Sequence, residues 1–268
     1  MSRDLTNQVL VLTGGSSGIG AATAVACARA SMDLVLSGRR ADRLGEVAER
    51  VRAYGRRAEI VVGDVTEPGL SARLLDTAQE KFGRFDVVFA NAGYGFTKPT
   101  VEMELAELRR IFEVNFFAAY ELLWEAARRL LAQKRPGHLL MSSSAVAKFT
   151  LRGFGAYSAS KAAQNHVCRA MRMELRPQGI EVASVHPITT ETEFFDQAAR
   201  YLGRTPDPRR KLAPPAGWFV QKPEKVADAV VRCLRRPRPE VWTSGTVRLI
   251  AGLITVFPRM MDAIGKRA

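Results

Sequence analysis

The sequence has few of the residues that hold metal ions or form disulfides. Only three cysteines and three histidines occur among its 268 residues. Cys27, Cys168 and Cys233 lie far apart and are odd in number, so they match neither a disulfide framework nor the short spacings of a zinc site. The sequence therefore predicts buried, reduced thiols in a cytoplasmic protein, and no metal site.

Long apolar stretches are also missing. No run of 18 apolar residues occurs, so the sequence predicts no membrane-spanning helix. The polar residues Thr6, Asn7 and Gln8 lead straight into the first apolar run, so we expect no secretory signal.

Acidic residues are scarce relative to basic ones, with 27 Asp and Glu against 40 Lys and Arg and a net charge of +13. Residues 200–268 hold 15 basic and 5 acidic residues. Such an excess attracts nucleic acid, anionic lipid or an anionic substrate. Arginines such as Arg128, Arg129 and Arg172 are scattered, however, as on solvated helix faces. We expect no nucleic-acid partner, and a membrane surface stays an alternative for the basic end.

Apolar runs alternate with helix-like segments along the chain. Because the runs are continuous in Val, Ile and Leu, they predict strands buried on both faces. The pattern predicts an α/β fold: a Rossmann-like, doubly wound parallel sheet of about seven strands, in a single domain over 1–268. Within it, the proline-rich stretch 188–222 is expected to form a substrate loop or lid. The candidate strands are 8–12, 33–37, 58–62, 86–89, 138–142, 180–185 and 240–242, and the candidate helices are 19–30, 41–54, 68–82, 101–132, 157–176, 191–202 and 223–235.

A glycine-rich turn follows the first strand. Gly14 lets the chain turn sharply, Gly18 lets the backbone approach a pyrophosphate, and Gly20 lets helix and strand pack closely. The free N–H groups and the dipole of the following helix favour phosphate. The turn therefore predicts dinucleotide binding, although its spacing differs from that of the commonest fingerprint. The whole turn reads Gly14, Gly15, Ser16, Ser17, Gly18, Ile19, Gly20.

Small or polar residues follow the other strands as well. In an open parallel sheet, ligands bind outside the carboxyl ends of the strands, so a cofactor is expected along this edge. These residues are Ser37, Arg39 and Arg40; Asp64 and Val65; Asn91, Ala92 and Gly93; Ser142, Ser143 and Ser144; and His186 and Pro187.

Tyr157 and Lys161 are four residues apart in a helix-forming stretch and share one helix face. A phenol is a poor proton donor and acceptor at neutral pH, because its ordinary pKa is near 10. A nearby ammonium and the positive charge of a bound nicotinamide are expected to lower that pKa. Ser144 precedes Tyr157 by thirteen residues, and its hydroxyl is expected to hold a substrate oxygen beside the phenol.

With these motifs, the chain resembles the short-chain dehydrogenase/reductase family over roughly 5–195. The resemblance implies catalytic roles for Asn115, Ser144, Tyr157 and Lys161, with Asn115 holding a proton-relay water. It also implies that the glycine turn holds the cofactor, that Asp64 and Val65 lie near its adenine, and that Asn91, Ala92 and Gly93 support the central sheet. The segment over the nicotinamide is implied to be Pro187, Ile188, Thr190 and Thr192.

Two residues depart from the family pattern. Ile188 stands where a glycine usually follows the proline, which puts the shape of the nicotinamide edge in doubt. Ala90 replaces a frequent asparagine. The spacing of Gly14, Ser17 and Gly20 argues against the extended, epimerase-like branch.

The cofactor is expected to be NADP(H). An NAD enzyme usually ends its second strand with a carboxylate, whereas this chain has Ser37, Arg39 and Arg40 there. An arginine matches a 2′-phosphate by charge and by its planar fork. We expect Arg39 to be the main contact, assisted by Ser37 or Arg40.

The expected substrate is an apolar ketone, aldehyde or alcohol. Six aromatic residues are expected near the pocket, although they could simply pack a lid. His186 is interpreted as a structural histidine rather than a catalytic one. The aromatic residues are Tyr94, Phe96, Phe149, Phe154, Phe194 and Phe195.

The expected activity is that of an oxidoreductase that interconverts a carbonyl and an alcohol by hydride transfer, with Tyr157 as acid/base. The alternatives are a non-catalytic NADP(H)-binding sensor or scaffold, a nucleic-acid or membrane-surface protein that uses the basic end of the chain, and a lipid carbonyl reductase associated with a membrane surface. The resemblance to the family implies that the protein forms a homodimer or homotetramer. Within the segment 244–268, the nine residues from Leu249 to Phe257 are apolar, which is half the length of a membrane span, and basic residues lie around them. We expect it to cover the pocket or pack against a second subunit, with peripheral membrane contact as the alternative.

Overall fold

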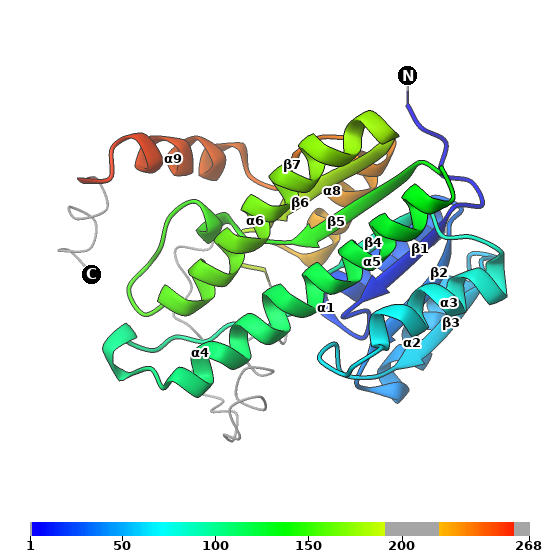
Figure 1. The fold of residues 1–268 in the computed structure, drawn as a ribbon, viewed down its shortest axis with the longest axis horizontal. Helices are drawn as coiled ribbons and strands as arrows, with labels where there is room; N and C mark the ends of the chain where they lie inside the picture. The colour runs from blue at the N-terminus through cyan, green and yellow to red at the C-terminus, as the bar shows by residue number, and fades with distance from the viewer. Residues whose placement is uncertain (1, 191–219, 260–268) are drawn as a thin grey trace.

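Seven parallel strands form one sheet in the computed structural model, which describes residues 2–190 and 220–259 (Figure 1). The strand order is β3-β2-β1-β4-β5-β6-β7, so the chain reverses its direction of winding between β3 and β4. The predicted doubly wound fold is confirmed. The strands are β1 (Val9–Thr13), β2 (Asp33–Gly38), β3 (Ala58–Val62), β4 (Val87–Ala90), β5 (Gly137–Ser142), β6 (Ile180–His186) and β7 (Glu240–Trp242).

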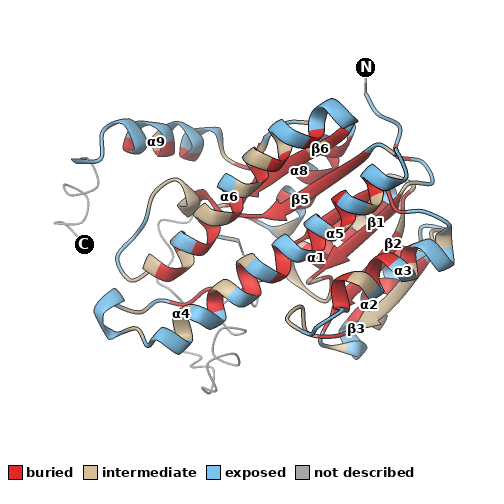
Figure 2. Cartoon of the chain, in the orientation of Figure 1, coloured by how far each residue is buried: buried red, intermediate tan, exposed pale blue. Residues whose placement is uncertain are grey.

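Helices cover both faces of this sheet. Alternate residues of the strands pack against α1, α2 and α8 on one face and against α3, α5 and α6 on the other. The central strands are therefore buried throughout, as Figure 2 shows, which explains their continuous apolar sequences. The helices of eight or more residues are α1 (Gly18–Arg29), α2 (Ala41–Arg52), α3 (Leu70–Phe82), α4 (Leu105–Phe112), α5 (Ala118–Ala132), α6 (Gly155–Leu175), α8 (Pro223–Arg235) and α9 (Gly245–Val256).

The predicted helix 101–132 is not one regular helix. A short 3-10 turn, Thr100–Glu102, comes before α4, and a π-helical turn, Glu113–Phe117, joins α4 to α5. A π turn carries one extra residue inside a helix, and such turns are frequent at functional sites. The periodicity of the sequence did not reveal the π-helical turn, because the apolar pattern continues through α4 and α5 on either side of it.

Helix α9 was not predicted. The Ser244 hydroxyl accepts a hydrogen bond from the main-chain N–H of Val247 and so caps its first turn. Val247, Ala251 and Ile254 are buried, while Leu249 and Phe257 are 65% and 58% exposed. In Figure 1 the helix stands apart from the sheet, and it contacts the 3-10 turn Ala145–Ala147 after β5.

The three thiols are buried and free, as predicted. None of the helices in the described part of the chain has the length and apolar character needed to cross a bilayer. The predicted helix 191–202 and most of the expected lid lie outside the described residues.

Candidate active site

The glycine turn after β1 is packed tightly against the turn after β4. Gly14 has φ +66° and Gly18 has φ +54°, in the left-handed region that favours glycine. A Cβ on Gly20 would lie 2.0 Å from the carbonyl oxygen of Gly14, so no side chain fits there. The Asn91 amide donates hydrogen bonds to the carbonyls of Thr13 (3.2 Å) and Gly14 (3.3 Å). The two turns therefore hold each other in place.

The first turn of α1 fits an anionic group. Ser17, the N-cap residue of α1, makes no side-chain capping hydrogen bond, and the first turn of α1 contains no acidic residue. The positive end of the helix dipole is thus not neutralised by the helix's own side chains. Together with the glycine backbone at Gly14 and Gly18, this matches the phosphates of a dinucleotide.

Basic side chains gather at the carboxyl end of β2, beside this turn. The guanidinium of Arg40 donates to the Ser16 hydroxyl at 3.3 Å. The guanidiniums of Arg39 and Arg110 lie 3.8 Å and 3.9 Å from the Asp64 carboxylate. Burial raises the pKa of Asp64, but hydrogen bonds from Thr66 and the charges of the two arginines outweigh it and lower the pKa. The structure thus brings Ser16, Arg39, Arg40 and Asp64 together, while Ser37 is fully buried.

Asn115 lies in the π-helical turn and is fully buried. Its Oδ1 accepts the main-chain N–H of Tyr94 at 3.0 Å, and its Nδ2 donates to the Tyr94 carbonyl at 2.9 Å and to the Ser160 hydroxyl at 3.1 Å. Its main-chain carbonyl accepts a hydrogen bond from Gln164 Nε2. Asn115 therefore ties the loop after β4 to α6. A Cβ on Gly93 would lie 3.0 Å from Asn115 Oδ1 and 3.4 Å from Lys161 Nζ, so glycine permits this close approach.

Three consecutive serines, starting with the last residue of β5, each make a different contact with α6. Lys161 Nζ donates to the carbonyl of Ser142 at 2.6 Å, and the Ser143 hydroxyl donates to the carbonyl of Lys161 at 2.8 Å. The Ser144 side chain is hydrogen-bonded to that of Tyr157. The predicted Ser144, Tyr157 and Lys161 are thereby brought into one cluster at the carboxyl edge of the sheet.

Burial dominates the titration of this cluster. It raises the pKa of Tyr157 to about 12, although the hydrogen bond with Ser144 acts in the opposite direction. It lowers the pKa of Lys161 to about 7. Lys161 Nζ lies 5.7 Å from the centre of the Tyr157 ring. Burial therefore raises the pKa of Tyr157 in the protein without cofactor. The predicted lowering also relies on the charge of the bound nicotinamide and stays a prediction.

The segment after β6 lies beside the serines. The main-chain N–H of Ala145 donates to the Pro187 carbonyl at 3.0 Å. The Thr190 hydroxyl donates to the carbonyl of Ile188 at 2.8 Å and accepts from Gln221 Nε2 at 3.2 Å. Thr192 lies outside the described residues.

The aromatic residues expected around the substrate divide into two groups. Tyr94 and Phe96 are buried in a small apolar cluster with Ile111 and Val114, so the expectation that they lie at a pocket rim is wrong. Phe154 packs edge-on against the Tyr157 ring at 6.2 Å, and Phe149 is partly buried. Phe194 and Phe195 lie outside the described residues.

Two residues of the site escaped the sequence analysis. Ser160 and Gln164 bind Asn115. The only signal for Ser160 and Gln164 was that both are polar and share the helix of Tyr157 and Lys161. A polar residue at these positions is equally consistent with a solvated face, so only packing reveals their role.

The family model for short chain dehydrogenases matches residues 8–201. The chain belongs to the short-chain dehydrogenase family. This oxidoreductase is 36% identical over 190 residues to the 1-deoxy-11-beta-hydroxypentalenate dehydrogenase of Streptomyces exfoliatus, covering 70% of this chain and 69% of that one.

Two other similarities cover more of this chain. The dehydrogenase is 32% identical over 235 residues to the glycine betaine reductase ATRR of Emericella nidulans, which covers 87% of this chain but only 18% of that longer protein. Its fold matches the crystal structure of a short-chain type dehydrogenase/reductase from Mycobacterium marinum with a TM-score of 0.79 and 27% identity, covering 91% and 96% of the two chains.

Proposed function

We propose that the protein is an NADP(H)-dependent oxidoreductase that interconverts an apolar ketone or aldehyde and the corresponding alcohol. The observation that carries this proposal is the contact between the side chains of Ser144 and Tyr157, one helical turn from Lys161. A non-catalytic sensor or scaffold would have no need of this buried cluster.

The roles of the three residues follow from their geometry. The bound cofactor supplies or accepts the hydride. The raised pKa of Tyr157 keeps a proton on its hydroxyl at neutral pH, ready to be donated to a substrate oxygen that gains negative charge. The Ser144 hydroxyl holds the same oxygen by a hydrogen bond. The Ser142 carbonyl holds Lys161 Nζ near Gly93.

The experiment is an assay of NADPH oxidation with a panel of aldehydes, ketones and steroids, and of NADP⁺ reduction with the matching alcohols. We expect turnover of apolar members of the panel, because the Phe154 ring beside Tyr157 offers an apolar wall. A protein that binds NADPH but turns over no member in either direction would support the sensor alternative.

The preference for NADP(H) rests on Arg39. We expect wild-type protein to bind NADPH at least about tenfold more tightly than NADH, or about 1.4 kcal/mol. In Arg39→Ala most of this preference disappears, because the 2′-phosphate loses a cation and Asp64 loses one of its two neighbouring arginines. Fluorescence titrations with both cofactors measure the ratio.

The matched control for Arg39 is Arg29→Ala. Arg29 forms an exposed ion pair with Asp228 at 3.2 Å, at the far end of α1. This control should keep the wild-type ratio of the two affinities. Equal affinity of the wild-type protein for NADPH and NADH would refute the assignment of the cofactor.

We also propose that the chain forms a homo-oligomer through apolar residues exposed on α5 and α9. Phe117, the last residue of the π-helical turn, is followed at about one-turn spacing by Tyr120 and Trp124 on α5; the three are 52%, 37% and 43% exposed. The Arg128 guanidinium lies 4.7 Å above the Trp124 ring. On α9, Leu249 is 65% exposed. Contiguous apolar surface of this kind marks an interaction site.

Trp124→Glu and Leu249→Glu test the two surfaces separately. We expect at least one of them to lower the molecular mass in sedimentation, because a buried carboxylate destabilises the interface. Tyr54→Glu, at another exposed aromatic residue, serves as the control. Unchanged mass for both variants, with loss of liposome co-flotation for Leu249→Glu, would favour peripheral membrane contact instead.

A further inference from the structure

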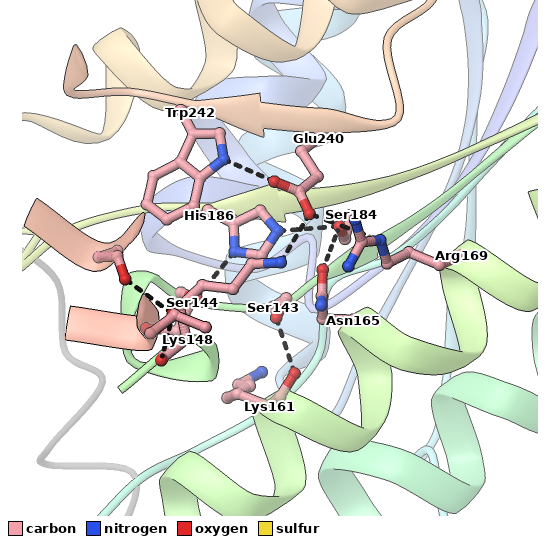
Figure 3. A network of polar contacts seen from close by, with 12 residues as sticks. Ser143, Ser144, Lys148, Lys161, Asn165, Arg169, Ser184, His186, Glu240 and Trp242 are labelled. Carbon is pink, nitrogen blue, oxygen red and sulfur yellow. Dashed lines mark hydrogen bonds and ion pairs between the residues drawn. The ribbon is translucent and has the colours of Figure 1, made fainter. Parts of the chain in front are cut away.

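The peptide group between Ser144 and Ala145 is held at both ends by the end of β6. His186 Nδ1 lies 2.9 Å from the carbonyl oxygen of Ser144, and the N–H of Ala145 donates to the carbonyl of Pro187 at 3.0 Å (Figure 3). Because a peptide group is planar, fixing both of its polar atoms fixes the direction in which the chain leaves Ser144. The orientation of the peptide that follows Ser144 is therefore set by residues outside its own turn, while the Ser144 hydroxyl itself accepts the main-chain N–H of Val146 at 3.4 Å.

The His186 ring cannot turn away from this contact. It is fully buried, and its Nε2 lies 2.9 Å from the Ser184 hydroxyl, which lies 3.1 Å from the side-chain amide of Asn165. The indole of Trp242 stacks on the ring with 4.6 Å between centroids and an angle of 8°. Both ring nitrogens are therefore occupied by protein, and neither is available to a substrate.

The ring is neutral at physiological pH. Burial lowers the pKa of His186 to about 4, against the opposing effect of the Ser144 carbonyl. A neutral imidazole carries one proton, and only the Nδ1–H form can donate to the Ser144 carbonyl. In that form Nε2 accepts the single proton of the Ser184 hydroxyl. The hydroxyl then has no proton for Asn165 Oδ1, so the 3.1 Å contact requires the amide NH₂ of Asn165 to face it.

The strand β7 supports the same arrangement from the other side. The Glu240 carboxylate accepts a hydrogen bond from Trp242 Nε1 at 2.9 Å and pairs with Lys148 Nζ at 2.7 Å. Lys148 is the C-cap residue of the 3-10 turn Ala145–Ala147, and Ser144 is its N-cap residue. Figure 3 shows Trp242, Glu240 and Lys148 around the His186 ring. The C-terminal part of the sheet thus encloses the serine turn.

We infer that His186 is a positioning residue for Ser144: its Nδ1–H holds the Ser144 carbonyl so that the serine hydroxyl stays beside Tyr157. The inference rests on the proposed function, since it assigns the histidine to the reaction of that site. It adds a residue that touches neither substrate nor cofactor but determines the geometry of one that does.

Two substitutions separate the contact from the packing. In asparagine the amide nitrogen is bonded to Cγ, as Nδ1 is in histidine, so His186→Asn keeps a donor toward Ser144. In glutamine the amide nitrogen is one bond further out, as Nε2 is, so His186→Gln loses that donor. We expect His186→Gln to lower kcat by about tenfold to a hundredfold, since small misplacements of reacting groups have effects of this size.

The other readouts distinguish positioning from stability. His186→Gln should keep the Kd for NADPH, because the contacts of the buried ring are with Ser144, Ser184 and Trp242. His186→Asn should have the higher kcat of the two. His138 is the control, since it is also buried, on neighbouring β5, but at the opposite end of that strand from Ser144. His138→Gln is expected to lower Tm while leaving kcat unchanged.

The inference is overturned if His186→Gln lowers Tm as His138→Gln does but retains the kcat of the wild type. Wild-type protein that turns over no substrate would instead refute the proposed function. In that case nitrogen NMR of the wild-type protein still tests the contact, because it reports which ring nitrogen carries the proton. The Nδ1–H tautomer is expected, and the Nε2–H tautomer would contradict the inference.

Discussion

Tyr157→Phe is expected to lower kcat by about a thousandfold while leaving the Kd for NADPH within about twofold of the wild type. The substitution removes only the hydroxyl that carries the proton. The ring keeps its edge contact with Phe154 and its position near Lys161, so the cofactor side of the site is unchanged. Steady-state kinetics on any substrate of the wild type, with a parallel NADPH titration, measures both quantities.

Tyr120→Phe is the matched control for this experiment. Tyr120 is 37% exposed on α5, and its hydroxyl is remote from the serine cluster, so kcat should not change. Wild-type turnover in Tyr157→Phe would remove this residue from the mechanism. The loss of one hydrogen bond with Ser144 should change the free energy of unfolding by only about 1 kcal/mol.

Gly20→Ala is expected to abolish cofactor binding, raising the Kd for NADPH by at least about a hundredfold, and to destabilise the fold by several kcal/mol. The new Cβ would lie 2.0 Å from the Gly14 carbonyl oxygen and 2.8 Å from Asn91 Nδ2. Both atoms belong to the interlocked turns after β1 and β4, so neither can move without opening the phosphate site. Thermal unfolding and NADPH titration measure the two effects.

Gly45→Ala, also a glycine-to-alanine substitution, is expected to change the stability of the protein in the opposite direction. Gly45 lies inside α2, and a Cβ there would meet no atom within 4 Å. Alanine should therefore stabilise the protein by roughly 0.5–1 kcal/mol through the lower entropy of its unfolded chain. If Gly20→Ala retained wild-type Tm and cofactor affinity, the close approach of the two turns would not be required.

Much of the fold could be predicted from local patterns. The continuous apolar strands predicted a sheet buried on both faces, and each predicted strand is present within one residue at either end. The helix errors have a local origin as well. The π-helical turn at Asn115 keeps the apolar pattern of its neighbours, and α9 contains glycines and β-branched residues that weaken a helical signal.

For the candidate site, the identity of the residues could be predicted, but their titration and burial could not. Ser144, Tyr157 and Lys161 could be recognised because residue type and spacing place them on one strand end and one helix face. The titration of the pair could not be predicted, because the pKa of Tyr157 depends on how completely the surrounding chain excludes water. Tyr94 and Phe96 were misplaced for the same reason, since an aromatic residue after a strand can face a pocket or a core.

The sequence by itself determined the parallel sheet, the glycine turn and the serine, tyrosine and lysine of the site, because each depends on residues close together in the chain. Only the tertiary structure decided the contacts that hold them. Gln164 meets Asn115 across 49 positions, and Lys148 meets Glu240 across 92. The carbonyl of Ser144 meets His186 across 42 positions. Such contacts depend on the order in which strands pair and on the packing between them, and no local pattern encodes either.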